Sequence, residues 1–316
     1  MQTLRFSYAD AFACLAGACP DTCCRDWEID LDEAARARYL AAPGELGQAL
    51  RRAMDAGGGE CFQLQGGFCP FLNEEGLCRI QKAWGSEALT VNCDSFPRFY
   101  EVYGASEELS LSPACPEAAR LLLEADAVEL ISTQDERLPE PNDLDALLVI
   151  GLRALRAKAL ALLAEDAPLA EKLGRLLAFA KVAQACLDAE DRSALRSLPI
   201  PEKKEPIAVD DNRLFLLYDN LDLLREDSIS LLHQPVTGAG DVRCAARYAQ
   251  YHLFRWLMKA SEDGRILPRV RGAIWGALCL ARMTAGGAES VTALYRYCRE
   301  VDHCPENLAA VQNAAL

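Results

Sequence analysis

Cysteine clustering constrains this chain more than any other feature of its sequence. Four cysteines fall between residues 14 and 24 in the spacing C-x4-C-x3-C-C, and nine of the 14 cysteines occur by residue 115. Close spacing lets a turn direct several sulfurs at one metal ion. If the chain is cytoplasmic, its thiols stay reduced, so structural disulfides are not expected. The pattern therefore favours metal ligation over disulfides, with plain burial of thiols as the other alternative.

The charge and hydropathy of the chain favour a cytoplasmic location. No apolar run approaches the roughly 20 residues that a membrane helix needs. The early segment has one basic residue, Arg5, and its apolar stretch is broken by Ser7 and Asp10, which is unlike a signal peptide. The 47 acidic residues exceed the 33 basic ones, giving a net charge of -14. This balance disfavours nucleic acid and membrane as partners.

The chain divides by texture into two expected domains. Residues 1–137 are rich in cysteine, glycine and proline, whereas residues 138–316 show apolar positions at three- and four-residue spacing, which is typical of amphipathic helices. We predict a mainly α fold, in which an irregular cysteine-rich metal-binding N-terminal module packs on a C-terminal multi-helix domain. A minor β-hairpin is expected over 98–104 and 108–112. Expected helices cover residues 29–42, 45–56, 77–84, 116–125, 143–165, 169–187, 212–226, 243–260 and 271–283.

The residues near the cysteines restrict the metal but do not select it. The three histidines, His233, His252 and His303, all lie outside the cysteine-rich part, so an all-thiolate site is expected. Such a site suits zinc and an iron–sulfur cluster equally well. The spacing C-x3-C-x2-C is not met, because Asp26 stands where the third cysteine would be. Adjacent Cys23 and Cys24 are not expected to bind one metal together.

Five further cysteines are scattered through the second half of the chain. Cys186, Cys244 and Cys279 lie on helical stretches and are expected to be small buried hydrophobes. Cys298, His303 and Cys304 could form an additional metal site. The favoured interpretation is a helix end, with Cys304 before Pro305, because three ligands are too few for a closed site.

Three blocks of sequence, in the same order, resemble the flagellin lysine-N-methylase family. They are FACLAGACPDTCCRDWEIDLD (12–32), CPFLNEEGLCRIQKAWGSEALTVNCDSFPR (69–98) and SPACPEAARL (112–121). The first block is also similar to small iron- or zinc-chelating modules with a C-x3-C-C core. The resemblance implies a lysine N-methyltransferase that acts on flagellin, uses S-adenosylmethionine and holds a [4Fe-4S] cluster. It places the motif cysteines at Cys14, Cys19, Cys23, Cys24, Cys69, Cys78, Cys93 and Cys115. Cys61 falls outside them, and which four bind the cluster is left open.

The residues offer candidates for the methyl donor but not for catalysis. No glycine-rich loop follows a strand, so a Rossmann site is not expected. Trp27 and Phe96, with Phe99 and Tyr100, could face a sulfonium ion through their rings, or simply pack in the core. Arg98 could clamp a carboxylate or form a surface ion pair.

The acidic side chains of the first block are interpreted as helix caps or a solvated edge rather than as a catalytic base; they are Asp26, Glu28, Asp30 and Asp32. No residue is assigned as catalytic. The alternative function is a non-enzymatic protein that binds zinc or iron and holds a partner through its helical domain.

Overall fold

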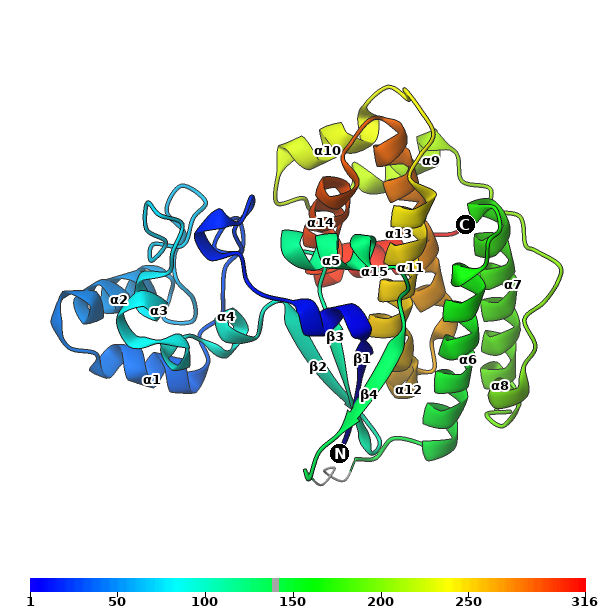
Figure 1. Cartoon of the computed structure of the whole chain (residues 1–316), viewed down its shortest axis with the longest axis horizontal. Coiled ribbons are helices and arrows are strands. Elements are labelled where there is room, and N and C mark those ends of the chain that lie inside the picture. The colour runs from blue at the N-terminus through cyan, green and yellow to red at the C-terminus, as the bar shows by residue number, and fades with distance from the viewer. Residues whose placement is uncertain (138–141) are drawn as a thin grey trace.

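The computed structural model describes residues 1–137 and 142–316. Helices predominate and a small sheet lies among them, so the expected mainly helical architecture is confirmed (Figure 1). The expected domain boundary between residues 137 and 138 meets a segment, 138–141, that lies outside the described residues, and it stays a prediction. The α-helices are α1 (Glu33–Ala41), α2 (Gly44–Ala56), α3 (Arg79–Trp84), α4 (Val91–Ser95), α5 (Pro116–Glu124), α6 (Ala146–Ala164), α7 (Leu169–Asp188), α8 (Ala194–Ser197), α9 (Asp211–Tyr218), α10 (Glu226–His233), α11 (Val242–Trp256), α12 (Ala260–Asp263), α13 (Ile266–Ala285), α14 (Ser290–Glu300) and α15 (Pro305–Asn313).

A small lobe contains α1 to α4 and has its own apolar core. Asp32 caps α1, because its carboxylate accepts a hydrogen bond of 2.9 Å from the N–H of Ala35. Gly85, at a φ of 85°, ends α3 as expected from the sequence. Tyr39, Phe62 and Phe71 belong to the lobe's apolar core. This core is a separate cluster from the large core of the helical body. The lobe is thus a separate packing unit that carries Cys61, Cys69, Cys78 and Cys93.

The expected hairpin is only part of a larger sheet. Four strands pair in the order β2-β3-β1-β4, namely β1 (Gln2–Phe6), β2 (Arg98–Tyr103), β3 (Ser106–Leu111) and β4 (Leu130–Gln134). β2 and β3 are antiparallel, as expected, whereas β1 runs parallel to β3 and antiparallel to β4. The prediction of an isolated hairpin was incomplete, because β1 finds its partners about a hundred residues away. Each outer strand, β2 and β4, leaves one edge of the sheet open.

The large apolar core spans both expected domains. It joins residues of the sheet, such as Phe6 and Tyr103, to the long helices α6, α7, α11 and α13. A buried ion pair fixes this junction: Arg156 of α6 donates from Nη2 to Glu108 of β3 at 2.7 Å. The helix expected over 212–226 is wrong beyond Tyr218, where α9 ends; residues 219–225 are not helical and α10 starts at Glu226. In the described ranges, no helix combines the length and apolarity needed to cross a membrane.

Candidate functional site

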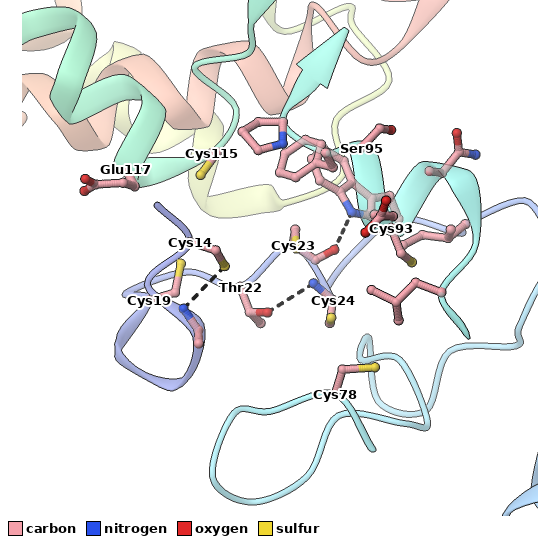
Figure 2. Close-up of a pocket in the computed structure, with 18 of the residues that line it drawn as sticks. Cys14, Cys19, Thr22, Cys23, Cys24, Cys78, Cys93, Ser95, Cys115 and Glu117 are labelled. Carbon is pink, nitrogen blue, oxygen red and sulfur yellow. Dashed lines mark hydrogen bonds between the residues drawn. The ribbon is translucent and has the colours of Figure 1, made fainter. Parts of the chain in front are cut away.

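A cavity of about 480 Å³ lies between the small lobe and the helical body. Its walls come from the first cysteine segment, the lobe helices α3 and α4, the start of β2, the start of α5 and helix α14 (Figure 2). Seven of the eight motif cysteines line it: Cys14, Cys19, Cys23, Cys24, Cys78, Cys93 and Cys115. The fold therefore brings together thiols that are separated by up to a hundred residues in sequence.

Cys69 is the motif cysteine that does not line the cavity. Its N–H donates to the carbonyl of Cys24 at 2.9 Å, and Leu72 forms a β-bridge with Cys78, so the main chain ties these three cysteines together. Cys61 is also outside the cavity, 3.7 Å from the carboxylate of Glu28.

Four motif cysteines accept hydrogen bonds from backbone N–H groups two residues further along the chain. The N–H of Ala16 lies 3.4 Å from the sulfur of Cys14. Equivalent contacts join Phe71 to Cys69, Ile80 to Cys78 and Glu117 to Cys115. The contacts at Cys69, Cys78 and Cys115 lower the pKa of the thiol that accepts them, and N–H bonds of this kind also tune metal-bound sulfur.

Burial opposes ionisation of most of these thiols. It raises the pKa of Cys69 to about 12 and those of Cys93 and Cys115 to about 11. The hydrogen bond between the adjacent thiols raises the pKa of Cys23 and lowers that of Cys24 to about 7. Cys24 therefore loses its proton before Cys23 does. A thiophilic cation would replace these protons, since thiolates are the form that binds metal.

The donor chemistry of the cavity therefore fits a thiolate-bound metal, but the donors do not converge. Among the residues described, no three histidine, cysteine, aspartate or glutamate side chains are arranged to hold one ion. The cysteines instead fall into two neighbourhoods, with Cys14, Cys19 and Cys115 on one side and Cys24, Cys78 and Cys93 on the other (Figure 2).

An aromatic wall adjoins the thiols. Trp27 and Phe96 are 5.6 Å apart, and His303 lies 5.3 Å from Trp27 and 5.4 Å from Phe99, all between ring centroids. Arg98 also lines the cavity, and its guanidinium sits 4.8 Å from the centre of the Phe12 ring. The sequence-based candidates Trp27, Phe96 and Arg98 are thus together.

Tyr100 is not part of this wall. It is 52% exposed and does not line the cavity, so the alternative that it packs in the core is wrong. Successive side chains of a strand point to opposite faces, and Phe99 takes the face toward the cavity.

His303 belongs to the cavity wall rather than to a C-terminal metal site. Its Nε2 lies 2.8 Å from the hydroxyl of Ser112, and burial and Arg255 lower its pKa to about 4. Cys298 is fully buried, whereas Cys304 points to Glu306 and precedes α15. The three side chains therefore do not meet, in line with the helix-end interpretation.

The lone cysteines behave largely as expected. Cys244 and Cys279 are buried in the large core, whereas Cys186 is only partly buried against it.

Arg299 of α14 connects the helical body to the first cysteine segment. Its Nη2 donates to the carbonyls of Asp21 and Thr22 at 2.7 and 3.2 Å, and its Nε donates to the carbonyl of Ala114 at 3.0 Å. Its guanidinium also stacks 5.1 Å from the centre of the Trp27 ring. One buried side chain therefore holds the backbone before Cys23 and the backbone before Cys115. The sequence did not indicate this role, because nothing local distinguishes Arg299.

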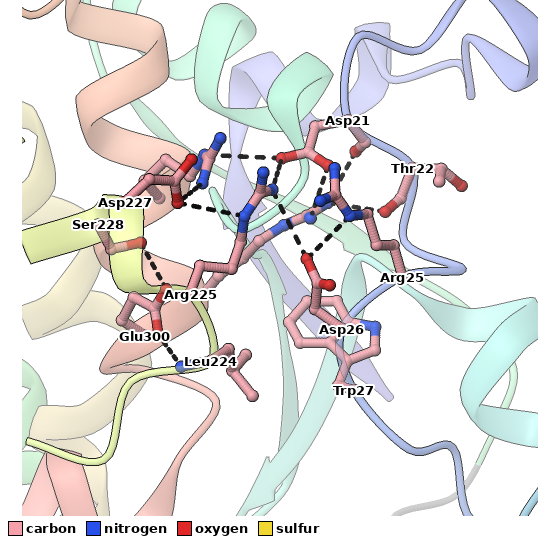
Figure 3. Close-up of polar contacts among 12 residues, drawn as sticks. Asp21, Thr22, Arg25, Asp26, Trp27, Leu224, Arg225, Asp227, Ser228 and Glu300 are labelled. Carbon is pink, nitrogen blue, oxygen red and sulfur yellow. Dashed lines mark hydrogen bonds and ion pairs between the residues drawn. The ribbon is translucent and has the colours of Figure 1, made fainter. Parts of the chain in front are cut away.

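Further ion pairs strengthen the same connection (Figure 3). Arg225 lies 2.9 Å from Asp21, 3.6 Å from Asp26 and 3.4 Å from Asp227. Asp26 is thus held between the first cysteine segment and the helical body, and is neither a cap nor a solvated edge. Glu28, Asp30 and Asp94 have exposed side chains and line the mouth of the cavity.

The chain is 36% identical over 133 residues to the "Flagellar biosynthetic protein FliU" of Salmonella muenchen, a match that covers 39% of this chain and 79% of that protein. It is equally similar, over 133 residues, to the "Lysine-N-methylase" of Salmonella typhimurium and of Salmonella choleraesuis, of which it covers 33%. The chain thus spans about a third of the length of these lysine-N-methylases. No protein-family model and no solved structure matches it.

Proposed function

Because the chain belongs to the family of the flagellar biosynthetic protein FliU and the lysine-N-methylases, we propose that it transfers methyl groups from S-adenosylmethionine to lysine side chains of flagellin. The observation that carries this proposal is the cavity, where motif cysteines, an aromatic wall and Arg98 come together. The whole activity is a proposal, since the similarity covers 39% of the chain. The proposed location is the cytoplasm.

The motif cysteines are the proposed ligands of a [4Fe-4S] cluster, with zinc as the alternative metal. Eight thiols exceed the four that one cluster needs. Cys14, Cys19 and Cys115 form one group of candidates, and Cys24, Cys69, Cys78 and Cys93 form the other. Cys23 lies between the groups, because it interacts with Cys24 and Cys93 as well as with Cys115. When bound, the cluster would order the cysteine segments and offer a site to the methyl donor.

The cavity residues have distinct proposed roles in binding the methyl donor. The rings of Trp27 and Phe96 would face the positive sulfonium, by cation–π attraction. Arg98 would pair with the donor's carboxylate, and no ion pair occupies this guanidinium in the described structure.

The reaction itself requires a neutral amine. The lysine ammonium first gives a proton to water, its neutral nitrogen attacks the sulfonium methyl, and the S–CH3 bond breaks with its electron pair left on sulfur. An exposed lysine has a pKa of about 10.4, so it must lose a proton at neutral pH.

The test combines metal analysis with a methylation assay. Protein purified without oxygen should contain iron and acid-labile sulfide. With S-adenosylmethionine it should add mass in steps of about 14 Da, one CH2 for each methyl group, to lysine-containing peptides of flagellin. Zinc alone, with flagellin binding but no added mass, would support the non-enzymatic alternative instead.

A further inference from the structure

The open edge of strand β2 leads directly into the cysteine-lined cavity. Residues 94–99 all line the cavity, and β2 begins within this segment at Arg98. The chain thus passes from the cavity wall to an outer strand of the sheet without a break (Figure 1).

Along this edge, the main chain of β2 has hydrogen-bonding groups without a strand partner among residues 1–137 and 142–316. The N–H of Ser112 donates to the carbonyl of Pro97 at 2.8 Å, which identifies residues 97 and 112 as a hydrogen-bonded pair. Bonded and non-bonded pairs alternate in an antiparallel ladder, so Arg98, Tyr100 and Val102 direct their N–H and C=O groups away from β3. β3 is the one strand paired with β2 in the described sheet.

The side chains along the edge are also open to an incoming chain. Tyr100 is 52% and Val102 is 44% exposed, and both are large apolar side chains on one face of the strand. An open strand edge with these properties accepts a further strand through main-chain bonds, while side chains supply specificity.

The charges at the cavity mouth indicate what such a strand would carry. Glu28, Asp30 and Asp94 are exposed there, and no hydrogen bond or ion pair to a basic side chain engages them in the residues described. This acidic mouth complements an ammonium group.

We propose that an extended, lysine-containing segment of the protein substrate adds to the sheet along β2 and that this pairing delivers its lysine to the cavity. This inference rests on the proposed function. A segment paired with Tyr100 and Arg98 leaves β2 at its first residue, where Pro97 and Phe96 already line the cavity. Strand β4 has an open edge too, but none of its residues lines this cavity.

A matched pair of proline variants tests the inference. Tyr100→Pro removes one outward N–H from β2 and leaves the ladder with β3 intact, as proline is tolerated at a sheet edge. Ser132→Pro does the same on β4, whose bonded pairs with β1 include residue 129 and whose residue 132 therefore points outward. Tyr100→Ala separates loss of the side chain from loss of the N–H. Val102→Pro is a second β2 variant in case Tyr100→Pro does not fold.

The readouts are flagellin binding and the KM for flagellin in the methylation assay. We expect at least a tenfold weaker binding and a tenfold higher KM for the β2 proline variants, with Ser132→Pro within twofold of the unaltered protein and S-adenosylmethionine binding unchanged in all. Unchanged binding by folded β2 variants would overturn the docking edge while leaving the proposed function standing. If the unaltered protein neither binds nor methylates flagellin, the proposed function is wrong. The proposal that a flagellin segment pairs with β2 then fails with it.

Discussion

Arg299 and Asp21 are 278 residues apart in sequence, yet the Nη1 of Arg299 lies 3.2 Å from Oδ1 of Asp21, and both side chains are almost fully buried. This pair joins α14 of the helical body to the loop that carries Cys19, Cys23 and Cys24. The shape of the cysteine-lined cavity therefore depends on a residue far from the cysteine motifs.

Replacing Arg299 by lysine should open the cavity. Lysine keeps the charge but cannot reach the carbonyls of Asp21, Thr22 and Ala114 at once, because it lacks the planar fork of donors. We expect a loss of about 2 kcal/mol in the free energy of unfolding and a lower metal content. Denaturant unfolding and metal analysis measure these effects.

Arg296→Lys provides the control for this variant. Arg296 lies 3.6 Å from Asp21 and makes no bond to the cysteine loop's carbonyls in the described structure. Its replacement should cost less than about 1 kcal/mol, as is usual for partly exposed pairs. Equal effects from both variants would show that Arg299 contributes only charge.

Single cysteine replacements test the ligand assignment. Cys19→Ala, Cys23→Ala and Cys93→Ala should each lose iron and colour or fail to fold in soluble form, because metal binding and folding are coupled. Cys186→Ala, in α7 and away from the cavity, should keep both. Full iron in all three variants would show that these thiols are not ligands.

Trp27 and Arg98 should affect the methyl donor differently. Trp27→Leu removes the ring that would face the sulfonium, and Arg98→Lys removes bidentate pairing with the carboxylate. We expect binding of S-adenosylmethionine to weaken by about tenfold in each, a change of about 1.4 kcal/mol. Calorimetry with S-adenosylhomocysteine distinguishes them, because this neutral thioether keeps the carboxylate and so remains sensitive to Arg98 alone. Equal sensitivity to Trp27 for both compounds would contradict a sulfonium contact.

His303 should make stability depend on pH. Its pKa is lowered to about 4 in the folded protein from 6.5 when exposed. The unfolded chain therefore binds the proton first as the pH falls through 6.5, and stability present above that pH is lost progressively toward pH 4. Between pH 7 and 5.5 we expect a loss of about 1 kcal/mol that is absent from His303→Gln. Identical pH profiles of unfolding in the two proteins would show that the imidazole is not held neutral.

His303→Gln also tests the excluded C-terminal metal site. The imidazole faces aromatic rings and Ser112, apart from Cys298 and Cys304. Metal content should therefore remain unchanged, and a loss of metal would restore the site.

Local features of the sequence were sufficient to predict the thiol chemistry, most helices and several of their ends. The Asp32 cap, the Gly85 stop and the position of Pro116 at the start of α5 depend on neighbouring residues, so they can be seen in a short window. The clustering of the cysteines was likewise visible, because residue type and spacing can be read from the chain itself.

The tertiary structure decided which of these groups meet. β1 pairs with β3 and β4 across about a hundred residues, Cys69 lies outside the cavity wall, and Arg299 and His303 reach that wall from α14 and the loop after it. Such contacts leave no periodic signal, since each depends on how distant elements pack rather than on the sequence around it. The sequence by itself therefore determined the chemistry available to this protein, and only the packing of the small lobe, sheet and helical body determined where that chemistry is assembled.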